Sequence, residues 1–385
     1  MKRYGVVVAG GGLVGTATAL GLARAGIATA LLEQRPAPAP ESGWDTRIYA
    51  INPGSQEFLQ RLGAWQRLDA ARLQAVYRMD VRGDGGGFLR LDSYEGGVER
   101  LATILESGRL QQALLDAARA EPLLDVLCPA TLAGVDWREA PVLTLDNGSE
   151  LQCELLAAAD GADSPLREAA GIAAPVTPYR QLGVVANFAC AKPHRGTAFQ
   201  WFRGTSILAW LPLPGQRLSM VWSAPEELAQ ELLALDGAAL AERVQAAGGG
   251  LLGRLELLTP AAGFPLRLIR PEKLFRPGFV LVGDAAHGVH PLAGQGVNLG
   301  FGDAESLVDV LAGRGRAACG DALLLARHAR RRREPVAAMQ SVTHGLYHLF
   351  AASAPLAGAL RNGGMTLLNQ LGPVKSQLIH HALIS

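Results

Sequence analysis

The sequence has few cysteines, almost no excess of charge of either sign, and no long uninterrupted apolar run. Its 385 residues include four cysteines, and no two of them form a C-x-x-C pair. This spacing excludes a disulfide framework and a thiolate zinc cluster, and it fits a reducing compartment. The formal net charge is +1, so the field of the whole molecule does not favour a polyanionic partner. We therefore expect no nucleic-acid partner.

The most apolar segment, residues 1–32, lacks the continuity of a membrane helix or a signal peptide. Three consecutive glycines, Gly10 to Gly12, interrupt it, and Arg24 lies within its second apolar stretch. A spanning helix needs about 20 predominantly apolar residues. The sequence therefore predicts a cytoplasmic protein. With 49% apolar residues over 385 positions, two domains are favoured over one.

This N-terminal segment contains instead the pattern of a dinucleotide-binding turn. The β-branched run Val6–Val8 predicts a buried parallel strand, and the Ala- and Leu-rich stretch Thr16–Ala25 predicts a helix. Between them, Gly10, Gly12 and Gly15 form G-x-G-x-x-G. In this motif the first glycine permits a tight turn, the second lets a pyrophosphate approach, and the third allows close packing of helix and strand. The free N–H groups at the start of the helix favour a phosphate.

A second predicted strand, Ala28–Leu32, ends at Glu33, which is placed to accept hydrogen bonds from ribose hydroxyls. We expect the neighbouring residues Leu13, Val14, Gln34 and Arg35 to complete the contacts with the nucleotide. This region alone does not distinguish NAD from FAD, because both contain ADP.

Two later segments repeat the arrangement of an apolar strand that ends in Asp and Gly. In one, Asp160-Gly161 precedes a helix that contains Arg167, with Asp163 or Ser164 as its predicted N-cap. In the other, the strand Phe279–Val282 ends at Gly283-Asp284, and a glycine-rich loop leads into a helix over Val297–Ala312. Ligands of doubly wound sheets bind at the carboxyl ends of parallel strands. Three such ends favour a long dinucleotide, and FAD fits better than NAD.

The segment "GDAAHGVHPLAGQGVNLG" also has the spacing of a metal site. Asp284, His287 and His290 follow one another at intervals of three. A metal would require these side chains to converge on one ion with tight geometry. The glycines and the helix that follow have no role in a metal site, whereas a loop around a flavin needs them. We therefore predict a flavin-binding loop and no metal.

Together, these segments resemble the three fingerprints of the single-component flavin aromatic hydroxylases, whose fold is that of para-hydroxybenzoate hydroxylase. Within this superfamily the chain resembles the ubiquinone-biosynthesis hydroxylases. Further stretches carry the resemblance: Asp45–Trp65, Leu211–Ser223, Phe264–Leu266, Ala329–Phe350 and Leu360–Leu383. The resemblance implies an α/β fold with a Rossmann-like FAD-binding domain, a mixed antiparallel β-sheet substrate domain and C-terminal helices. It places the FAD-binding domain at 1–175 and 271–330, with part of 70–100 on the substrate side, the substrate domain at 176–270, and the C-terminal helices at 331–385.

The resemblance also assigns roles to residues. It places Gly10, Gly12 and Gly15 on the pyrophosphate, Glu33 on the adenosine ribose, Arg47 on the flavin side of the cofactor, Asp160 and Gly161 beside the pyrophosphate, and Gly283 and Asp284 at the ribityl chain. The backbone N–H groups of Gly294, Gln295, Gly296, Val297 and Asn298 would face the flavin pyrimidine edge, and Pro291 would lie beside the ring near the substrate.

Some positions depart from the pattern of the resembled family. Members often have Thr where this chain has Gly288, and Arg where it has Gly302. Near the start of the helix in "ILESGRLQQALL", the usual asparagine and arginine are replaced by Ser107 and Gly108. The cofactor contact expected from that helix therefore falls on Arg109 or Gln111.

The implied reaction hydroxylates the aromatic ring of a polyprenylated phenol or benzoquinol in ubiquinone biosynthesis. No side chain supplies an electrophilic oxygen, so the resemblance implies FAD, NADH or NADPH as co-substrate, and O2, through a flavin C4a-hydroperoxide. His290 and Pro291 are the candidates for assisting the phenol by hydrogen bonding. The alternative is that His290 only hydrogen-bonds the backbone beside the flavin.

The middle of the chain reads as alternating strands: "LGVVANFAC", "AFQWFRG", "SILAWLPL" and "RLSMVWSA". Their aromatic residues could line a pocket for a prenylated ring, but for any single one we favour the sheet core; these are Phe188, Trp201, Trp210, Trp222 and Phe264. The run Arg330 to Arg333 is expected at the start of a helix that continues through Leu349. Such runs usually form a solvated face. Near apolar C-terminal stretches this run could contact anionic lipids, which would make the protein peripheral on the inner face of the cytoplasmic membrane.

Other functions stay open at this stage. The chain could hydroxylate a soluble aromatic compound, or it could be a catalytically silent flavin-binding subunit of a biosynthetic assembly. A flavin halogenase is disfavoured, because no W-x-W motif occurs. Other ubiquinone-biosynthesis proteins and a second copy of the chain are further expected partners.

Overall fold

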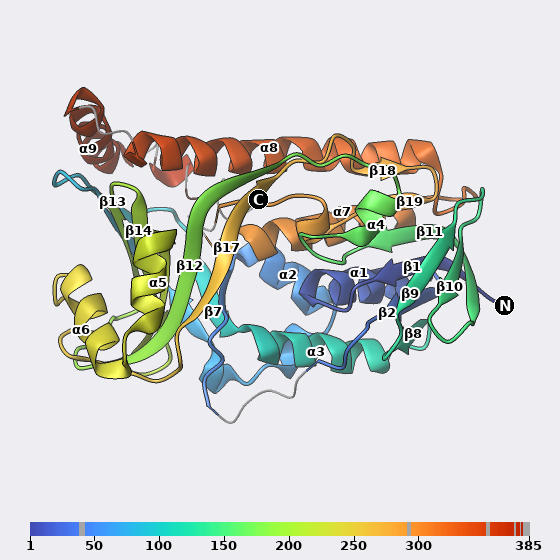
Figure 1. The fold of residues 1–385 in the computed structure, drawn as a ribbon, viewed down its shortest axis with the longest axis horizontal. Coiled ribbons are helices and arrows are strands. Elements are labelled where there is room, and N and C mark those ends of the chain that lie inside the picture. The colour runs from blue at the N-terminus through green and yellow to red at the C-terminus, as the bar shows by residue number, and fades with distance from the viewer. Residues whose placement is uncertain (38–42, 291–293, 352–354, 373–374, 378, 380–385) are drawn as a thin grey trace.

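The computed structural model describes residues 1–385 except 38–42, 291–293, 352–354, 373–374, 378 and 380–385. The described chain forms two large mixed sheets and one small sheet, with helices packed around them (Figure 1). This confirms the predicted fold class, a Rossmann-like unit joined to a mixed antiparallel sheet and C-terminal helices.

The first sheet is built on five parallel strands. Its order is β18 (Phe275–Arg276), β19 (Phe279–Leu281), β11 (Glu150–Ala158), β1 (Lys2–Ala9), β2 (Thr29–Leu32) and β8 (Leu124–Leu127), and β10 (Val142–Leu145) and β9 (Leu132–Asp136) extend it from β11. The pairs β19–β11, β11–β1, β1–β2 and β2–β8 are parallel. The carboxyl ends of β1, β11 and β19 therefore lie at one edge, each followed by one of the three predicted fingerprints.

Helices cover both faces of this sheet because its strands are apolar on both sides. On one face, α1 (Leu13–Arg24), α3 (Ser107–Arg119) and α7 (Gly296–Ala312) share a core with side chains such as Val6, Val8 and Leu155. On the other, α4 (Pro165–Ala169) packs beside β9 and β10 on Val7, Leu156 and Phe279. Ser164 caps α4 through its hydroxyl, which confirms one of the two predicted caps.

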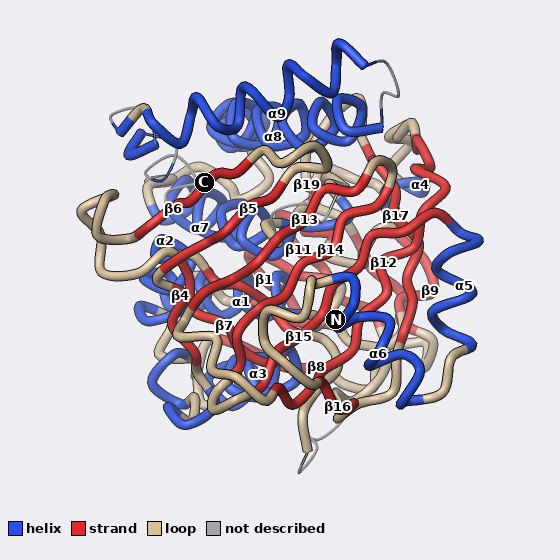
Figure 2. The backbone as a smooth tube through the Cα atoms, turned by 90° about the vertical axis from the view of Figure 1, so that its left-hand side faces the viewer, coloured by secondary structure: helices blue, strands red, loops and turns tan. Residues whose placement is uncertain are grey.

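The second sheet is mainly antiparallel. Its order is β16 (Leu255–Leu257), β12 (Val176–Cys190), β15 (Arg217–Pro225), β14 (Ser206–Leu213), β13 (Thr197–Arg203), β5 (Arg78–Arg82) and β6 (Phe88–Asp92), and β17 (Ala262–Ile269) also pairs with β12. All four strands predicted in the middle of the chain are present. Helices α5 (Glu226–Ala234) and α6 (Gly237–Ala247) cover one face of this sheet. They lie at one side of the molecule, as Figure 2 shows.

A small sheet lies between the large ones. It consists of β3 (Ile48–Ile51), β7 (Ala102–Glu106) and β4 (Gln74–Val76), and its side chains pack against Ala198 and Leu213 of the second sheet. Helix α2 (Pro53–Arg61) follows β3, with Asn52 as its cap. Short 3-10 turns occur at Trp65–Arg67, Ala70–Arg72 and Gly283–Ala285. The small sheet thus connects the residues around Arg47 to the second sheet.

Two C-terminal helices, α8 (Ala322–Ala351) and α9 (Pro355–Gln370), lie along one side of the molecule (Figures 1 and 2). Helix α8 begins at Ala322, so the prediction that the arginine run starts the helix is wrong. The residues between Ala322 and Arg330 are good helix formers that continue the same helix, and the run lies inside it. Within the described chain, no helix is long and apolar enough to cross a membrane.

Candidate flavin site

The glycine loop between β1 and α1 forms an open cradle. Gly10 has φ +108°, and a Cβ there would lie 2.3 Å from the Ala159 carbonyl oxygen. A Cβ at Gly15 would lie 1.9 Å from the Gly10 carbonyl oxygen, so close packing requires glycine at both positions. At Gly12, by contrast, a Cβ would meet no atom within 4 Å. Gly12 precedes the first turn of α1 and forms no side-chain cap, so that turn offers its N–H groups to an anion.

Glu33 and Gln111 fix the outer side of this loop. The Gly11 N–H donates to Glu33 Oε2 at 2.6 Å, and Gln111 Nε2 donates to the Gly11 carbonyl at 2.8 Å. Gln34 and Arg35 are exposed beside Glu33, and Leu13 is buried at the start of α1. Of the two candidates on α3, Gln111 is therefore the one that contacts the glycine loop. Arg109 Nε donates to Glu106 Oε2 at 2.9 Å instead.

The Asp160-Gly161 turn meets the loop after β19 through Arg167. The buried Arg167 guanidinium donates to the carbonyls of Ala162 and Ala285, both at 3.0 Å. Asp160 Oδ2 accepts the Leu166 N–H, whereas its Oδ1 is buried without a partner among the described residues. A buried carboxylate oxygen without a donor is costly, so a ligand donor at this position is expected.

Asp284 lies near Arg47 and Tyr49 at the small sheet. Part of its side chain is exposed to solvent, and the surrounding protein raises the pKa of its carboxyl against the opposing charges of His287 and Arg47. Burial also raises the pKa of Tyr49, whose hydroxyl interacts with Arg47 and Ser107. Arg47, Tyr49 and Asp284 therefore lie close enough to affect one another's charge. The tight turn at Gly283, φ +63°, packs against Val14 of α1.

The two histidines of the D-x-x-H-x-x-H spacing point to different partners. His287 Nε2 lies 2.6 Å from Asp303 Oδ2, and both side chains are buried. Burial alone would lower the pKa of His287, but the adjacent Asp303 carboxylate raises it. His290 instead bonds Gln181 of β12. In the described part of the chain, no three His, Cys, Asp or Glu side chains are grouped to hold a metal ion.

His290 braces the loop against the second sheet. Its Nε2 lies 2.9 Å from Gln181 Oε1, and its ring packs edge-on against Tyr179. Burial lowers the pKa of His290 to about 4, so the ring is neutral near pH 7 and Nε2 carries the proton that Gln181 accepts. Its Nδ1 is buried and has no partner among the described residues.

The first turn of α7 closes the loop. The helix begins at Gly296, one residue earlier than predicted, and Gln295 precedes it without a side-chain cap. Asn298 is buried and bonds the backbone of Ala50 and Asn52, so its side chain joins α7 to β3 and α2. Gly294 adopts φ +61°. Pro291 lies outside the described residues, and its predicted place beside the ring stays a prediction.

The second sheet turns one face of β12 toward this loop. Gln181 on that face bonds His290, and Asn187, six positions along, donates its Nδ2 to the Asp45 carbonyl at 2.8 Å. Side chains on a strand alternate between faces, so Gly183 and Val185 lie on the same face as Gln181 and Asn187. They therefore face the space between residues 283–290, called here the flavin loop, and the segment that leads to Arg47. Their neighbours across β15 and β14 are small or β-branched, namely Val221 and Ala209, and both are half-buried.

The aromatic residues that could have lined a pocket lie mostly on the opposite face. Phe188, Trp201, Trp210 and Trp222 are buried between the sheet and helices α5 and α6. This confirms the core interpretation that we favoured for each of them. Phe264 differs: it is 36% exposed and its ring covers Gly183.

The sequence did not predict the roles of three residues near the loop, Asp303, Arg332 and Gln340. Asp303 on α7 accepts from the Gly283 N–H at 2.9 Å, Arg332 on α8 donates to Asp303 at 2.7 Å, and Gln340 on α8 donates to the Gly288 carbonyl at 3.1 Å. Arg332 is buried, whereas the other arginines of the run, Arg330, Arg331 and Arg333, are exposed. The local charge pattern does not distinguish the four arginines, because the burial of Arg332 depends on its contact with Asp303 on α7.

These features fit FAD. The open backbone at Gly12, the uncapped start of α1, the Asp160 oxygen without a partner in the described chain and the exposed Asp284 all follow the carboxyl ends of neighbouring parallel strands. Such an edge of a doubly wound sheet binds a dinucleotide along its length.

Comparison with known proteins agrees with this assignment. Residues 3–342 match the family described as "FAD binding domain". The chain is 33% identical to the 3-demethoxyubiquinol 3-hydroxylase of Escherichia coli over 98% of each chain. It is 31% identical to the ubiquinone hydroxylase UbiL of Rhodospirillum rubrum, over 99% of this chain and 90% of that protein.

Solved structures share the fold at lower identity. PqsL, a probable FAD-dependent monooxygenase from Pseudomonas aeruginosa, superposes with a TM-score of 0.79 at 23% identity, covering 94% of this chain and 99% of that chain. The p-nitrophenol 4-monooxygenase PnpA of Pseudomonas putida gives 0.81 at 19% identity, covering 100% and 99%. The chain therefore belongs to the FAD-dependent monooxygenases, in the branch that contains the ubiquinone-biosynthesis hydroxylases.

Proposed function

We propose that this enzyme hydroxylates the aromatic ring of a polyprenylated phenol or benzoquinol, with NADH or NADPH and O2 as co-substrates. One structural observation carries the proposal. The face of β12, β15 and β14 between His290 and Asp45 presents small apolar side chains, Val185, Val221 and Ala209, toward the flavin loop. These three side chains are small and uncharged, and the Phe264 ring covers the adjoining Gly183, so this surface, called here the floor, suits an apolar ring. Its two relatives named above are hydroxylases of ubiquinone or a ubiquinol, which supports the substrate class.

The residues around the cofactor have distinct roles in this proposal. Gly10 and Gly15 shape the loop, Gly12 would admit the pyrophosphate to the start of α1, and Glu33 would accept from the adenosine ribose. Asp284 binds the ribityl chain, and Arg47 lies on its flavin side. When bound here, FAD would supply the activation of O2, with the nicotinamide as the source of electrons. The start of α7, with the N–H groups of Gly296 and Val297, stabilises negative charge without a lysine.

The protein side of the reaction consists of orientation and exclusion of water. The apolar floor and the Phe264 ring over Gly183 keep water from the reacting face. His290 is neutral, and its Nδ1 has no partner in the described chain but is enclosed by protein, so a hydrogen bond from the substrate hydroxyl requires a local rearrangement of the loop. Peripheral contact with the inner face of the membrane, other pathway proteins and a homodimer belong to the same proposal, on the sequence arguments alone.

Filling the floor tests this assignment. Ala209→Trp and Val221→Trp should abolish substrate-stimulated NAD(P)H oxidation while FAD stays bound, because the indole occupies the ring's place. Val176→Trp is the matched control, since Val176 is on β12 but is 45% exposed. Product is measured by mass spectrometry with a prenylated phenol and with soluble phenols. Hydroxylation of soluble phenols alone would favour the second candidate, a hydroxylase of soluble aromatics. Unchanged turnover in Ala209→Trp and Val221→Trp would show that the aromatic ring does not bind over this face of the second sheet.

A further inference from the structure

Helix α8 contacts the flavin loop, here residues 283–290, along its length. Arg332 reaches the α7 side of the loop through Asp303, Gln340 donates to the Gly288 carbonyl at 3.1 Å, and the Tyr347 ring lies 5.7 Å from that of His290. The three positions are eight and seven residues apart, so they recur about every two turns and lie on one face of α8. Figure 1 shows α8 running past both large sheets. The helix is thus placed to hold the loop as a unit.

Asp303 is the centre of the first contact. Its Oδ2 accepts from the Gly283 N–H at 2.9 Å and from His287 at 2.6 Å, and its Oδ1 accepts from Arg332 Nε at 2.7 Å. Arg332 also donates to the Leu299 carbonyl at 2.9 Å. All the side chains are buried. Because Gly283 directly precedes Asp284, a shift of Asp303 would move the backbone that orients the Asp284 carboxylate.

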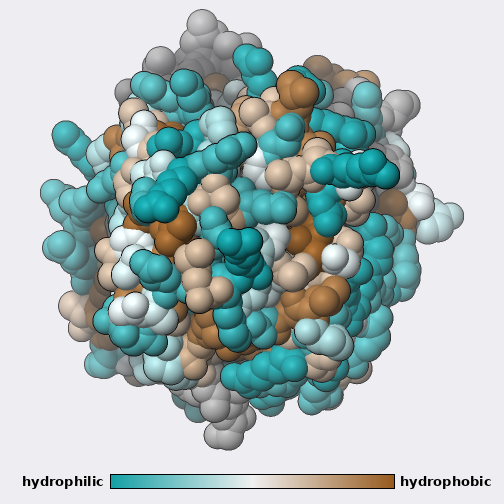
Figure 3. All heavy atoms as spheres, turned by 90° about the vertical axis from the view of Figure 1, so that its right-hand side faces the viewer, coloured by the Kyte–Doolittle hydropathy of each residue, from teal (hydrophilic) through white to brown (hydrophobic). Residues whose placement is uncertain are grey.

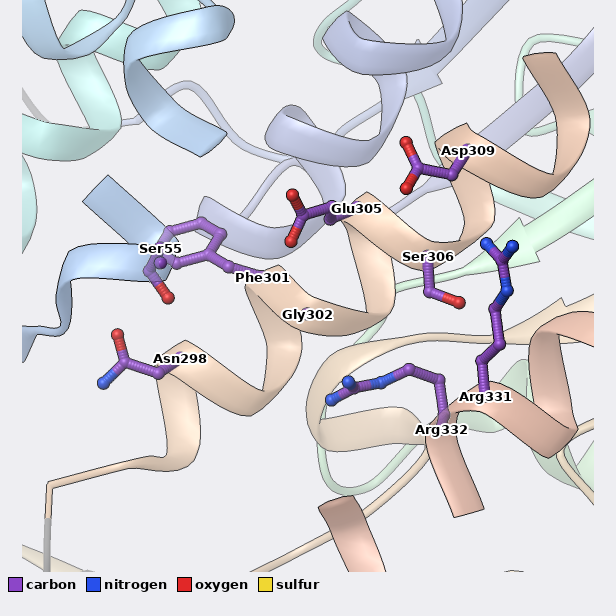
Figure 4. Close-up of a pocket in the computed structure, with 10 residues that line it drawn as sticks. Ser55, Asn298, Phe301, Gly302, Glu305, Ser306, Asp309, Arg331 and Arg332 are labelled. Carbon is purple, nitrogen blue, oxygen red and sulfur yellow. The ribbon is translucent and has the colours of Figure 1, made fainter. Parts of the chain in front are cut away.

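Space for Arg332 exists because residue 302 is glycine. A Cβ at Gly302 would lie 2.8 Å from each terminal guanidinium nitrogen of Arg332. Figure 4 shows Arg332 extending from α8 toward α7 beside Gly302, while Arg331 extends toward Ser306 and Asp309, further along α7. Here α8 supplies the cation beside Asp303. A pocket of about 190 Å³ between α2, α7 and α8 adjoins this guanidinium.

We propose that Arg332, in the space left by Gly302, and Gln340 are positioning residues that hold the flavin loop in its FAD-binding geometry. They touch neither FAD nor substrate and act through Asp303 and the Gly288 carbonyl. The proposal rests on the flavin site assigned above but not on the identity of the aromatic substrate. The proposal is tested by FAD binding, so it would not be contradicted if the enzyme failed to hydroxylate a prenylated phenol.

The test compares Arg332→Ala, Arg332→Lys, Gly302→Ala and Gln340→Met with the control Arg333→Ala, the exposed neighbour. FAD affinity is titrated on apoprotein by flavin fluorescence, with the visible spectrum of bound flavin and the thermal unfolding of the apoprotein. Arg332→Ala should weaken FAD binding about tenfold or more and shift the spectrum, since a buried carboxylate loses a charged donor. Arg332→Lys should restore only part, because lysine cannot donate to Asp303 and Leu299 in the same fork.

Gly302→Ala separates positioning from folding. Its Cβ displaces the end of the Arg332 side chain but leaves the cation near Asp303, so the apoprotein should lose less stability than Arg332→Ala does, while FAD binding weakens several-fold. Low guanidinium chloride, well below unfolding concentrations and compared with sodium chloride, should restore FAD binding to Arg332→Ala but not to Gly302→Ala. If Arg332→Ala does not fold, Gly302→Ala and Gln340→Met decide. FAD affinity within twofold of native in these two variants would overturn the proposal.

Discussion

At the scale of single residues, the glycines of the G-x-G-x-x-G motif are required for two different reasons: close packing of the protein and access for a ligand. Gly10 and Gly15 are glycines because backbone atoms occupy the space of a Cβ, at 2.3 Å and 1.9 Å. Gly12 has open space instead, so its lack of a side chain serves something that is not protein. Glycine is thus required for protein packing at positions 10 and 15 and for ligand access at position 12.

This difference predicts opposite outcomes for two alanine variants. Gly12→Ala should change the apoprotein's unfolding free energy by less than about 1 kcal/mol, because the methyl group meets no protein atom. It should nevertheless weaken FAD binding at least about tenfold, because the methyl lies between the backbone and the pyrophosphate. Gly15→Ala should destabilise the apoprotein itself. Urea unfolding and flavin titration of both variants check this; equal loss of stability in the two would contradict it.

The sequence could not decide between Arg109 and Gln111. The family motif at the start of α3 is displaced by one position in this chain, so its spacing left both residues as candidates for the cofactor contact. A helix rotates 100° per residue, so neighbouring candidates face different surroundings. The structure directs Gln111 to the glycine loop and Arg109 to Glu106. Only the packing of α3 against α1 settles that rotation.

At the scale of elements, the strands and helices around the three fingerprints were predicted to within a few residues. Apolar runs, glycine turns and caps act over short distances, so β1, α1 and α7 could be located from sequence. The floor of small residues on the second sheet could not, because the alternation of "LGVVANFAC" does not say which face α5 and α6 cover. The burial of Arg332 was missed for the same reason: its partner Asp303 lies 29 positions away. The boundaries at 175 and 270 stay a prediction.

Helix α9 is joined to the β5–β6 turn by two neighbouring side chains, Asn362 and Arg361. Asn362 Oδ1 accepts the N–H groups of Gly85 and Gly87 at 3.1 and 3.0 Å, and its Nδ2 donates to Asp84 Oδ1 at 2.9 Å. Arg361 pairs with the same Asp84 carboxylate. The glycines of the turn leave the space that Asn362 fills.

Asn362→Ala should therefore loosen this junction without affecting the flavin. Leaving two backbone donors without an acceptor costs about 1–3 kcal/mol, so hydrogen exchange should accelerate at residues 83–87. The control is Asn369→Ala, on the same helix, whose side chain accepts one N–H, that of Arg90; its effect should be smaller. FAD affinity should stay native in both. Unchanged exchange at 83–87 in Asn362→Ala would show that the junction does not hold the turn.

At the scale of the whole molecule, apolar side chains concentrate in the interior and charges are balanced over the surface. On the face at the N-terminal end, described hydrophilic and hydrophobic side chains alternate in small areas (Figure 3). Some apolar side chains of α8 and α9 are exposed, among them Val342, Leu349 and Leu367. Inside, however, several ionisable groups are buried, and these connect the stability of the fold to pH.

The unfolding free energy should fall between pH 6.5 and pH 4. Burial lowers the pKa of His290 and of His328 to about 4 from the ordinary 6.5. Above pH 6.5 both are neutral in folded and unfolded chains; below it the unfolded chain takes up protons that the folded chain refuses. At pH 5 this costs on the order of 2 kcal/mol per histidine. His287, whose pKa is raised, acts in the opposite direction.

Urea unfolding at pH 7.5 and pH 5.0 measures this loss. His328→Asn should reduce the difference between the two pH values by about 2 kcal/mol, because His328 is buried on α8 and bonds Ser306 rather than a residue of the flavin loop. Arg330→Ala, an exposed change on the same helix, is the control. An equal loss in native chain and His328→Asn would mean that this histidine is protonated in both states.

The order of strands in the first sheet has a consequence for synthesis on the ribosome. Strand β1 is made first, yet its sheet is completed by β19 and its helical layer by α7, which ends at Ala312. All of β12 to β17 emerges in between. The face of α1 that packs on α7 therefore waits, uncovered, while the chain that forms the second sheet is translated. During translation the first sheet therefore stays incomplete until β19 has been made. The second sheet, whose last strand is β17, is the first large sheet for which all strands are available.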